Sequence, residues 1–178
     1  MNVRKLTASA LFIALNVVLG TLTTALKIPL LFLDTVGTVL GAVLFGPLWG
    51  AAIGGLTNGV LGVTSAPRAL PFAIVNIIVG FFVGWVAKKW GFGFWTALFT
   101  GLALAVLAPF VGTFVAVGFF GGITGDFNDV LFTALRRGGQ TVFSSAFYPR
   151  ILSNLTDKIL TCLLVSLLLP TLKKALRE

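Results

Sequence analysis

The stretch YPRILSNLTDKILTCLLVSLLLP, residues 148–170, joins a run apolar enough to cross a membrane to a strongly polar head. The polar residues at that head are Arg150, Asn154, Asp157 and Lys158. With about 100° of rotation per residue, they fall together with Thr161 within roughly one third of a helix circumference. A charge inside hydrocarbon costs several kcal/mol unless it faces a partner or a polar cavity. The stretch therefore predicts a membrane helix whose polar stripe points into a bundle or lies at its mouth.

The composition of the whole chain points to the same solvent. Of its 178 residues, 57% are hydrophobic and only 10% are charged, which is more apolar surface than a soluble domain of this length can bury. The net charge is +8, but the thirteen basic residues are scattered singly or in pairs. We expect these charges to set orientation in a lipid bilayer and not to bind nucleic acid.

Several classes of chemistry are excluded by the residues that the chain lacks. It has no histidine, one cysteine and no glutamate except Glu178, the last residue. Zinc sites of the usual His/Cys type, histidine-based triads and a Cys-paired disulfide are therefore excluded. No phosphate-binding GxGxxG or Walker pattern is present, so any ATP-driven step needs another subunit. We predict no catalytic residues, no metal and no cofactor, and hence no enzyme.

Apolar runs separated by charges, Gly and Pro predict an all-α integral membrane bundle of six transmembrane helices, forming a single transmembrane domain over residues 1–178. The predicted spans are 6–26, 35–46, 48–63, 69–87, 94–121 and 146–170. The second run is short, because twelve residues cover only about 18 Å of the roughly 30 Å hydrocarbon core. That span is tilted, irregular or longer at its outer end.

The basic residues predict the orientation. With the N-terminus in the cytoplasm, seven lie inside: Arg4, Lys5, Lys88, Lys89, Lys173, Lys174 and Arg177. Four lie outside: Lys27, Arg68, Arg136 and Arg137. Both termini are then cytoplasmic. Four tryptophans fall near the cytoplasmic boundary, as an interfacial aromatic belt predicts: Trp49, Trp85, Trp90 and Trp95.

Three polar connections cluster on the predicted outer face, where recognition loops are usually placed: residues 27–34, 63–71 and 123–140. Within the last, residues 126–137 carry acids in the first turn and arginines at the end, which predicts a short surface helix. A lid over a cavity is the second interpretation of this helix.

Other polar residues lie within or at the ends of the apolar runs. Thr57, Asn58 and Asn76 fit interhelical hydrogen bonding as well as ligand binding. Asp34 and Arg68 stand at outer helix ends, where they either contact solute or anchor the helix. Asp157 has two open interpretations as well: it binds a solute or an ion, or it neutralises Lys158, Lys27 or an arginine.

Glycines recur at a spacing that lets helices approach closely. The pairs and triplet are Gly37/Gly41, Gly46/Gly50/Gly54, Gly55/Gly59, Gly80/Gly84 and Gly118/Gly122. We expect them to serve internal packing.

The opening RKLTASALFIALNVVLG, residues 4–20, carries Ala10 and Ala14 in an A-x-x-x-A spacing. Together with residues 32–62 and 69–89, it resembles the substrate-binding S components of energy-coupling factor (ECF) vitamin transporters. The resemblance extends over essentially the whole chain as a diffuse pattern. It implies a bundle in a bacterial or archaeal plasma membrane that captures a water-soluble vitamin or vitamin precursor outside the cell.

The same resemblance implies partners and a site. The partners are a transmembrane coupling subunit and two ABC ATPases, with Ala10 and Ala14 at the coupling interface. Residues 27–34 become a gate over the solute. By their location, the expected substrate-binding residues are Asp34, Arg68, Asn76, Tyr148, Arg150, Asn154 and Asp157.

Two alternatives to an S component remain at this point. A stand-alone ion-coupled secondary transporter or channel would use Asp157 to carry the coupling ion, although no internal repeat is visible. An intramembrane enzyme would have only Ser/Lys or paired aspartates for its chemistry. If the chain is an S component, four classes of solute stay open: vitamin B6 forms, thiamine precursors, riboflavin and cobalamin.

Overall fold

The computed structural model describes residues 3–26 and 28–175, so Lys27 and Arg177, two of the basic residues used above for orientation, lie outside it. Its elements are α1 (Val3–Ala25), α2 (Val36–Phe45), α3 (Pro47–Thr64), η1 (Pro67–Ala69), α4 (Ala73–Trp90), α5 (Phe94–Phe120), α6 (Asn128–Arg137) and α7 (Val142–Ala175). The described residues contain no strand, which confirms the all-α prediction.

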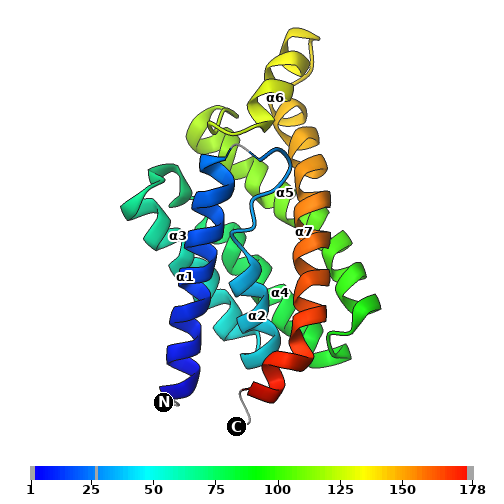
Figure 1. Ribbon diagram of the computed structural model, residues 1–178. Coiled ribbons are helices and arrows are strands. Elements are labelled where there is room, and N and C mark those ends of the chain that lie inside the picture. Colours follow the sequence, from blue (N-terminus) through cyan, green and yellow to red (C-terminus); the bar gives the residue numbers. More distant parts are fainter. Residues whose placement is uncertain (1–2, 27, 176–178) are drawn as a thin grey trace.

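Within the described residues, four helices are long and apolar enough to cross a membrane: α1, α4, α5 and the part Val142–Leu172 of α7. They correspond to four of the six predicted spans, and α2 and α3 lie in the same bundle (Figure 1). The count of six spans stays a prediction. In Figure 1, α1 begins and α7 ends at one end of the molecule, and α6 lies at the other.

The short second span is explained by irregular backbone. Helix α2 has ten residues, which is about 15 Å or half of the hydrocarbon core. Before it begins, the chain leaves the top of α1 and runs down the bundle as an irregular, non-helical segment with turns at residues 29–30 and 34–35 (Figure 1). Non-helical backbone is tolerated at this depth only where protein groups satisfy it. We call residues 28–35 the entry segment.

Close helix contacts occur where the glycine spacing predicts them, but not at every such glycine. A Cβ placed on Gly80 of α4 would lie 2.2 Å from the carbonyl oxygen of Gly50 in α3. The two backbones can approach so closely only because both residues lack a side chain. A Cβ on Gly59 or Gly118 would meet nothing within 4 Å, so that part of the pattern does not serve packing within this chain.

A buried amide joins the first three helices. Asn16 of α1 is fully buried and donates from Nδ2 to the hydroxyls of Thr38 (2.9 Å) and Thr57 (3.0 Å). Its Oδ1 accepts the backbone N–H of Gly37 at 2.6 Å. This node fixes α1 against α2 and α3 and positions the beginning of α2, below the entry segment.

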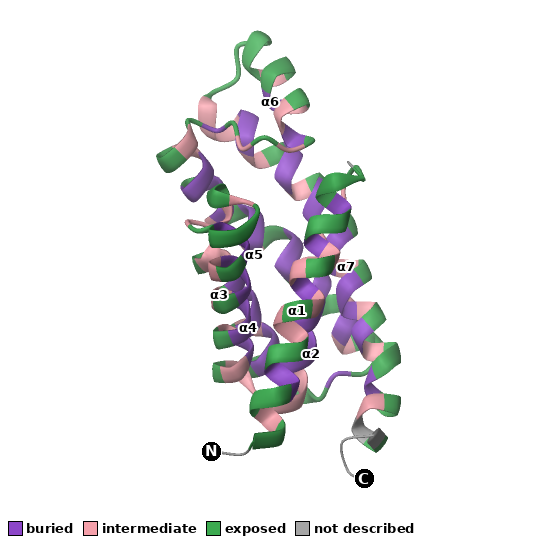
Figure 2. Cartoon of the chain, turned by 60° about the vertical axis from the view of Figure 1, so that its left-hand side comes forward, coloured by how far each residue is buried: buried purple, intermediate pink, exposed green. Residues whose placement is uncertain are grey.

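Burial follows the inside of the bundle. Figure 2 shows buried residues on the inward faces of the helices and exposed residues along their outer faces. Many of the exposed side chains are large and apolar, for example Leu11, Phe99 and Leu167. In water such a surface would drive association, whereas in a bilayer it is the surface that contacts lipid.

Candidate functional site

The polar stripe of α7 is buried, as its helical spacing predicts. Arg150, Asn154, Asp157, Lys158 and Thr161 are each at most 9% exposed. On the other side of the helix, Leu155 is 40% exposed. The stripe therefore faces the interior of the bundle, and its charges must find partners there.

Asp157 holds the backbone of the entry segment. Its Oδ1 accepts the N–H groups of Phe32 (2.9 Å) and Leu33 (2.8 Å), and its Oδ2 lies 2.6 Å from Nζ of Lys158. Asp157 itself is fully buried. Hydrogen bonds to an ionised acceptor are about twice as strong as neutral ones, so this carboxylate satisfies the two backbone donors well.

Lys158 extends the same cluster towards the start of α2. Its ammonium group donates to Oγ1 of Thr35 at 3.0 Å and lies 3.9 Å from Oδ1 of Asp34. The Asp34 side chain is 28% exposed, whereas that of Asp157 is fully buried. We call Asp34, Thr35, Asp157 and Lys158 the polar anchor. It contains two carboxylates and one ammonium, and Asp34 is the acid with the weaker partner.

The entry segment adopts a costly conformation under this anchor. Leu30 (φ 63°) and Leu33 (φ 52°) both have left-handed backbones, which for residues other than Gly cost on the order of 1–3 kcal/mol each. The carbonyl of Phe32 accepts the Thr23 hydroxyl at 2.7 Å. The contacts with Asp157 and Thr23 therefore fix a segment that does not fold this way by local preference.

Asn76 belongs to a second interhelical contact beside the anchor. Its Nδ2 donates to Oδ1 of Asn58, and Nδ2 of Asn58 donates to the carbonyl of Ala69 at 2.9 Å. These bonds join α4, α3 and η1, so both asparagines make the interhelical contacts that were one of their two interpretations. The amide of Asn76 also lies near the carboxyl of Asp34.

Arg150 forms a separate contact about 10 Å along α7 from Asp157. Its guanidinium donates to the carbonyl of Ala146 at 2.8 Å and to Oγ1 of Thr124 at 2.9 Å. That hydroxyl donates to Asp126 at 2.9 Å. Arg150 therefore fastens the connection between α5 and α6 to α7. Asn154 is bonded to the same turn, because its Nδ2 donates to the carbonyl of Arg150 at 2.9 Å.

The predicted surface helix is present as α6 at this end of the molecule. Asp129 accepts the N–H groups of Thr124 and Gly125 ahead of the helix. Asn128 is buried and its Oδ1 accepts the hydroxyl of Ser153 at 3.1 Å. The helix is thus tied to α7 by side-chain contacts.

Two of the expected site residues lie away from the stripe. Arg68 in η1 is exposed, with its guanidinium 5.9 Å from the centre of the Phe120 ring. Tyr148 is 58% exposed, and its ring neighbours Phe147. The structure therefore brings Asp34, Asn76 and Asp157 together. Asn154 and Arg150 lie further along α7, towards α6. Arg68 and Tyr148 are at the surface.

Some polar groups were not singled out from the sequence. Asn16, Thr35 and Ser153 make buried contacts and Thr124 makes a partly buried one. Asn16 stands alone among apolar residues, whereas the other three lie beside polar residues that were singled out. Among the described residues, three buried hydroxyls have no hydrogen-bond partner: those of Thr113, Ser145 and Thr161. A buried hydroxyl without a partner costs about 1–3 kcal/mol.

The small residues of α1 lie on its outer side. Ala10 and Ala14 are both exposed, beside the exposed Leu11 and Val18. This part of α1 consequently presents a shallow apolar surface that is not covered by the chain's own helices.

Comparison with known protein families identifies a family. The family model described as "ECF transporter, substrate-specific component" matches residues 4–169. No curated protein and no solved structure matches the chain. The family match covers nearly the whole sequence, including the polar anchor and the α7 stripe.

Proposed function

The chain belongs to the family of substrate-specific components of ECF transporters, and on this premise we propose that it captures a water-soluble vitamin or vitamin precursor outside the cell. It is accordingly a multi-pass membrane subunit that binds substrate, and the family is one of transport proteins and not of enzymes. In the proposal, delivery follows through a transmembrane coupling subunit and two ABC ATPases. The membrane is the plasma membrane of a bacterium or archaeon, with both termini in the cytoplasm.

The observation that carries the proposed site is the bond between Asp157 and the entry segment. The segment passes through the half of the bundle nearer α6, where a solute arriving from outside would enter. We assign it the role of gate. Release of the Phe32 and Leu33 N–H groups from Asp157 would let the segment move aside, and the left-handed residues Leu30 and Leu33 favour that release because their conformation is costly.

Asp34 is the acid that we assign to the solute. Asp157 and Lys158 are already bonded to each other and to the entry segment, whereas Asp34 is partly exposed and 3.9 Å from its nearest cation. Asn76, Asn154 and Arg150 would add amide and guanidinium donors. Thr161 lies about one turn from Asp157 on the same stripe and adds a hydroxyl without a partner, whereas Ser145 is about 18 Å from Asp157 along α7. Arg68 and Tyr148 remain at the surface. This set suits a small solute with several polar groups.

The exposed surface around Ala10 and Ala14 is our proposed contact with the coupling subunit. Small residues let a partner helix approach the α1 backbone closely, which gives strong van der Waals contact inside a bilayer. The surface lies on α1, whereas the polar anchor consists of residues from the entry segment and α7. Binding of the solute and binding of the coupling subunit are therefore separable by mutation.

A stand-alone ion-coupled transporter or channel is the second candidate. The observation in its favour is the imbalance of the anchor, where two carboxylates share one ammonium group and a coupling ion would supply the missing charge. Uptake of the solute by cells distinguishes the S component from the stand-alone transporter. We expect uptake to stop on ATP depletion and to persist when the ion gradient alone is collapsed; the reverse result would favour the second candidate.

A further inference from the structure

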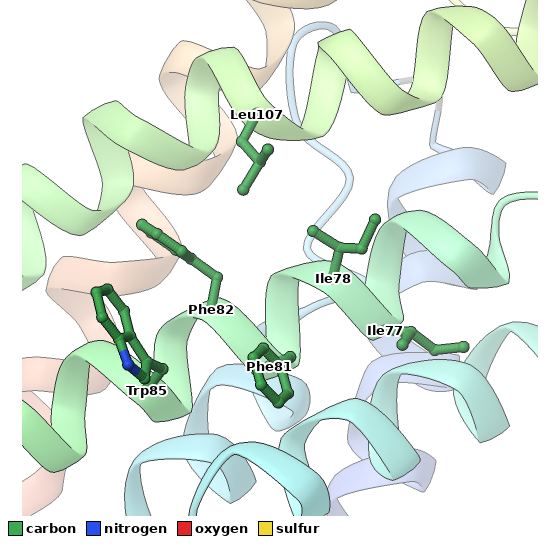
Figure 3. A pocket seen from close by; sticks show the side chains of 6 residues that line it. All are labelled: Ile77, Ile78, Phe81, Phe82, Trp85 and Leu107. Atoms are coloured by element: carbon green, nitrogen blue, oxygen red, sulfur yellow. The ribbon is translucent and has the colours of Figure 1, made fainter.

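An apolar groove lies between α4 and α5, apart from the polar anchor. It has a volume of about 280 Å³ and is lined by Ile77, Ile78, Phe81, Phe82, Trp85 and Leu107. Figure 3 shows Leu107 pointing from α5 towards Ile78 and Phe82 on α4. Phe81 and Trp85 are 49% and 45% exposed, so the groove opens on the outer surface of the bundle. In a membrane that surface faces lipid.

The groove leads to a pair of cations. Lys88 and Lys89 occupy the last turn of α4, and at about 100° per residue they share the face of the helix that lines the groove. Nζ of Lys89 lies 5.5 Å from the centre of the Trp85 ring and 4.5 Å from that of Trp90. Residues 73–120, which include α4, α5 and their connection, contain no acidic residue. The two ammonium groups therefore have no carboxylate on either helix of the groove.

We propose that this groove binds one acyl chain of an anionic phospholipid, with the phosphate head group on Lys88 and Lys89. From Ile77 to Trp85 the groove is about 12 Å long, close to the roughly 15 Å hydrocarbon depth of one leaflet. Basic pockets beside membrane helices are typical sites for anionic head groups, and Trp is typical of the head-group level. The lining offers one polar group, the indole N–H of Trp85, which does not suit a water-soluble vitamin.

A second copy of this chain fits the groove less well. The chain carries a net charge of +8, and the same face of a second copy would bring Lys88 and Lys89 near another pair of lysines. An anionic lipid instead supplies the missing negative charge at the head-group level. The site is independent of the solute: it would exist whichever vitamin the protein binds.

Native mass spectrometry of the intact, detergent-purified protein tests this site. The probes are phosphatidylglycerol and phosphatidylcholine with identical acyl chains. We expect phosphatidylglycerol to be retained on the order of tenfold more strongly, and the Lys88→Gln/Lys89→Gln variant to lose that preference. Arg136→Gln/Arg137→Gln removes the same charge from α6 and should keep it. Equal retention of the two lipids by the unaltered protein would overturn the proposal, as would equal loss in both variants.

Fluorescence quenching tests the location separately. Phosphatidylglycerol with brominated chains should quench tryptophan emission more than the brominated phosphatidylcholine. The difference should vanish in Trp85→Phe/Trp90→Phe, because the two rings are 5.4 Å apart and both lie beside Lys89, and should persist in Trp95→Phe. A difference that survives in Trp85→Phe/Trp90→Phe would place the lipid outside the groove. A dimer that dissociates on substitution of the exposed groove residues Phe81 and Trp85 would assign the groove to a second copy and overturn the lipid.

Discussion

The carboxylate of Asp157 accepts the backbone N–H of Leu33 at 2.8 Å, although the two residues are 124 positions apart in sequence. The same oxygen accepts the N–H of Phe32, and the other oxygen holds Lys158. One buried side chain on the last helix thus satisfies backbone groups of the irregular segment that precedes α2. The charged head of the 148–170 stretch serves the folded structure directly, and its proposed role in transport depends on that structure.

Removal of the Asp157 charge should destabilise the protein strongly. In Asp157→Asn, Lys158 remains buried with only Asp34 at 3.9 Å, and breaking a buried ion pair costs about 3–5 kcal/mol. We expect a lower Tm in detergent. Adding Lys158→Met should recover part of the loss, because no uncompensated cation then remains. A double variant that is less stable than Asp157→Asn would mean that Lys158 has a stabilising role apart from the pair.

Arg150 should control the order of the α5–α6 connection. Arg150→Met removes charged hydrogen bonds to Thr124 and Ala146, each worth about 1.5–3 kcal/mol. Local opening of residues 121–127 should then be about 10- to 100-fold more frequent, which amide hydrogen exchange measures. Arg137→Met, at the exposed end of α6, is the control. Unchanged exchange in Arg150→Met would show that α6 holds this connection without the arginine.

The contact between α3 and α4 should reject even a methyl group. In Gly80→Ala the new Cβ would lie 2.2 Å from the Gly50 carbonyl, and overpacking of this kind typically costs 1–3 kcal/mol. Gly118→Ala adds the same atom inside α5, where nothing lies within 4 Å, and Ala is the better helix former. Thermal unfolding should separate the two variants. Equal Tm values for the two variants would show that α3 and α4 do not approach so closely at Gly80.

The proposed coupling surface predicts a separation of binding from transport. Ala10→Leu with Ala14→Leu changes two exposed positions, so solute affinity should be unaffected while uptake is lost. Affinity is measured on the purified subunit and uptake in cells that contain the coupling module. Leu11→Ala with Val18→Ala is the comparison at exposed neighbours on the same helix. Normal uptake by the two-leucine variant would eliminate this surface as the interface.

Helical periodicity was enough to predict much of the fold and the direction of the stripe. The rotation of about 100° per residue places Arg150, Asn154 and Asp157 on one face, and these residues are buried together. The same arithmetic puts Tyr148 about 200° from Arg150, so its exposed position was already implied by the sequence. Site residues chosen by nearness in sequence alone were less well placed.

The sequence contains no comparable signal for contacts between residues that lie far apart along the chain. The entry segment has left-handed residues at Leu30 and Leu33, positions where no glycine announces such a backbone. Its hydrogen bonds come from Asp157, which no local pattern connects to residues 28–35. Asn16 was missed for a similar reason: a single amide in an apolar run has no visible partner until α2 and α3 pack against it.

We propose above all that this chain binds a polar small molecule beside the polar anchor, with Asp34 as a direct contact. The most direct measurement is native mass spectrometry of the protein purified from its own membranes, with identification of any small molecule released. We predict one vitamin or vitamin precursor per chain, lost in Asp34→Asn while the Tm stays near that of the unaltered protein. Recovery of the same molecule, at the same occupancy, from the folded Asp34→Asn variant would contradict the assignment of Asp34. The absence of any bound or bindable vitamin in the unaltered protein would contradict the proposed function itself.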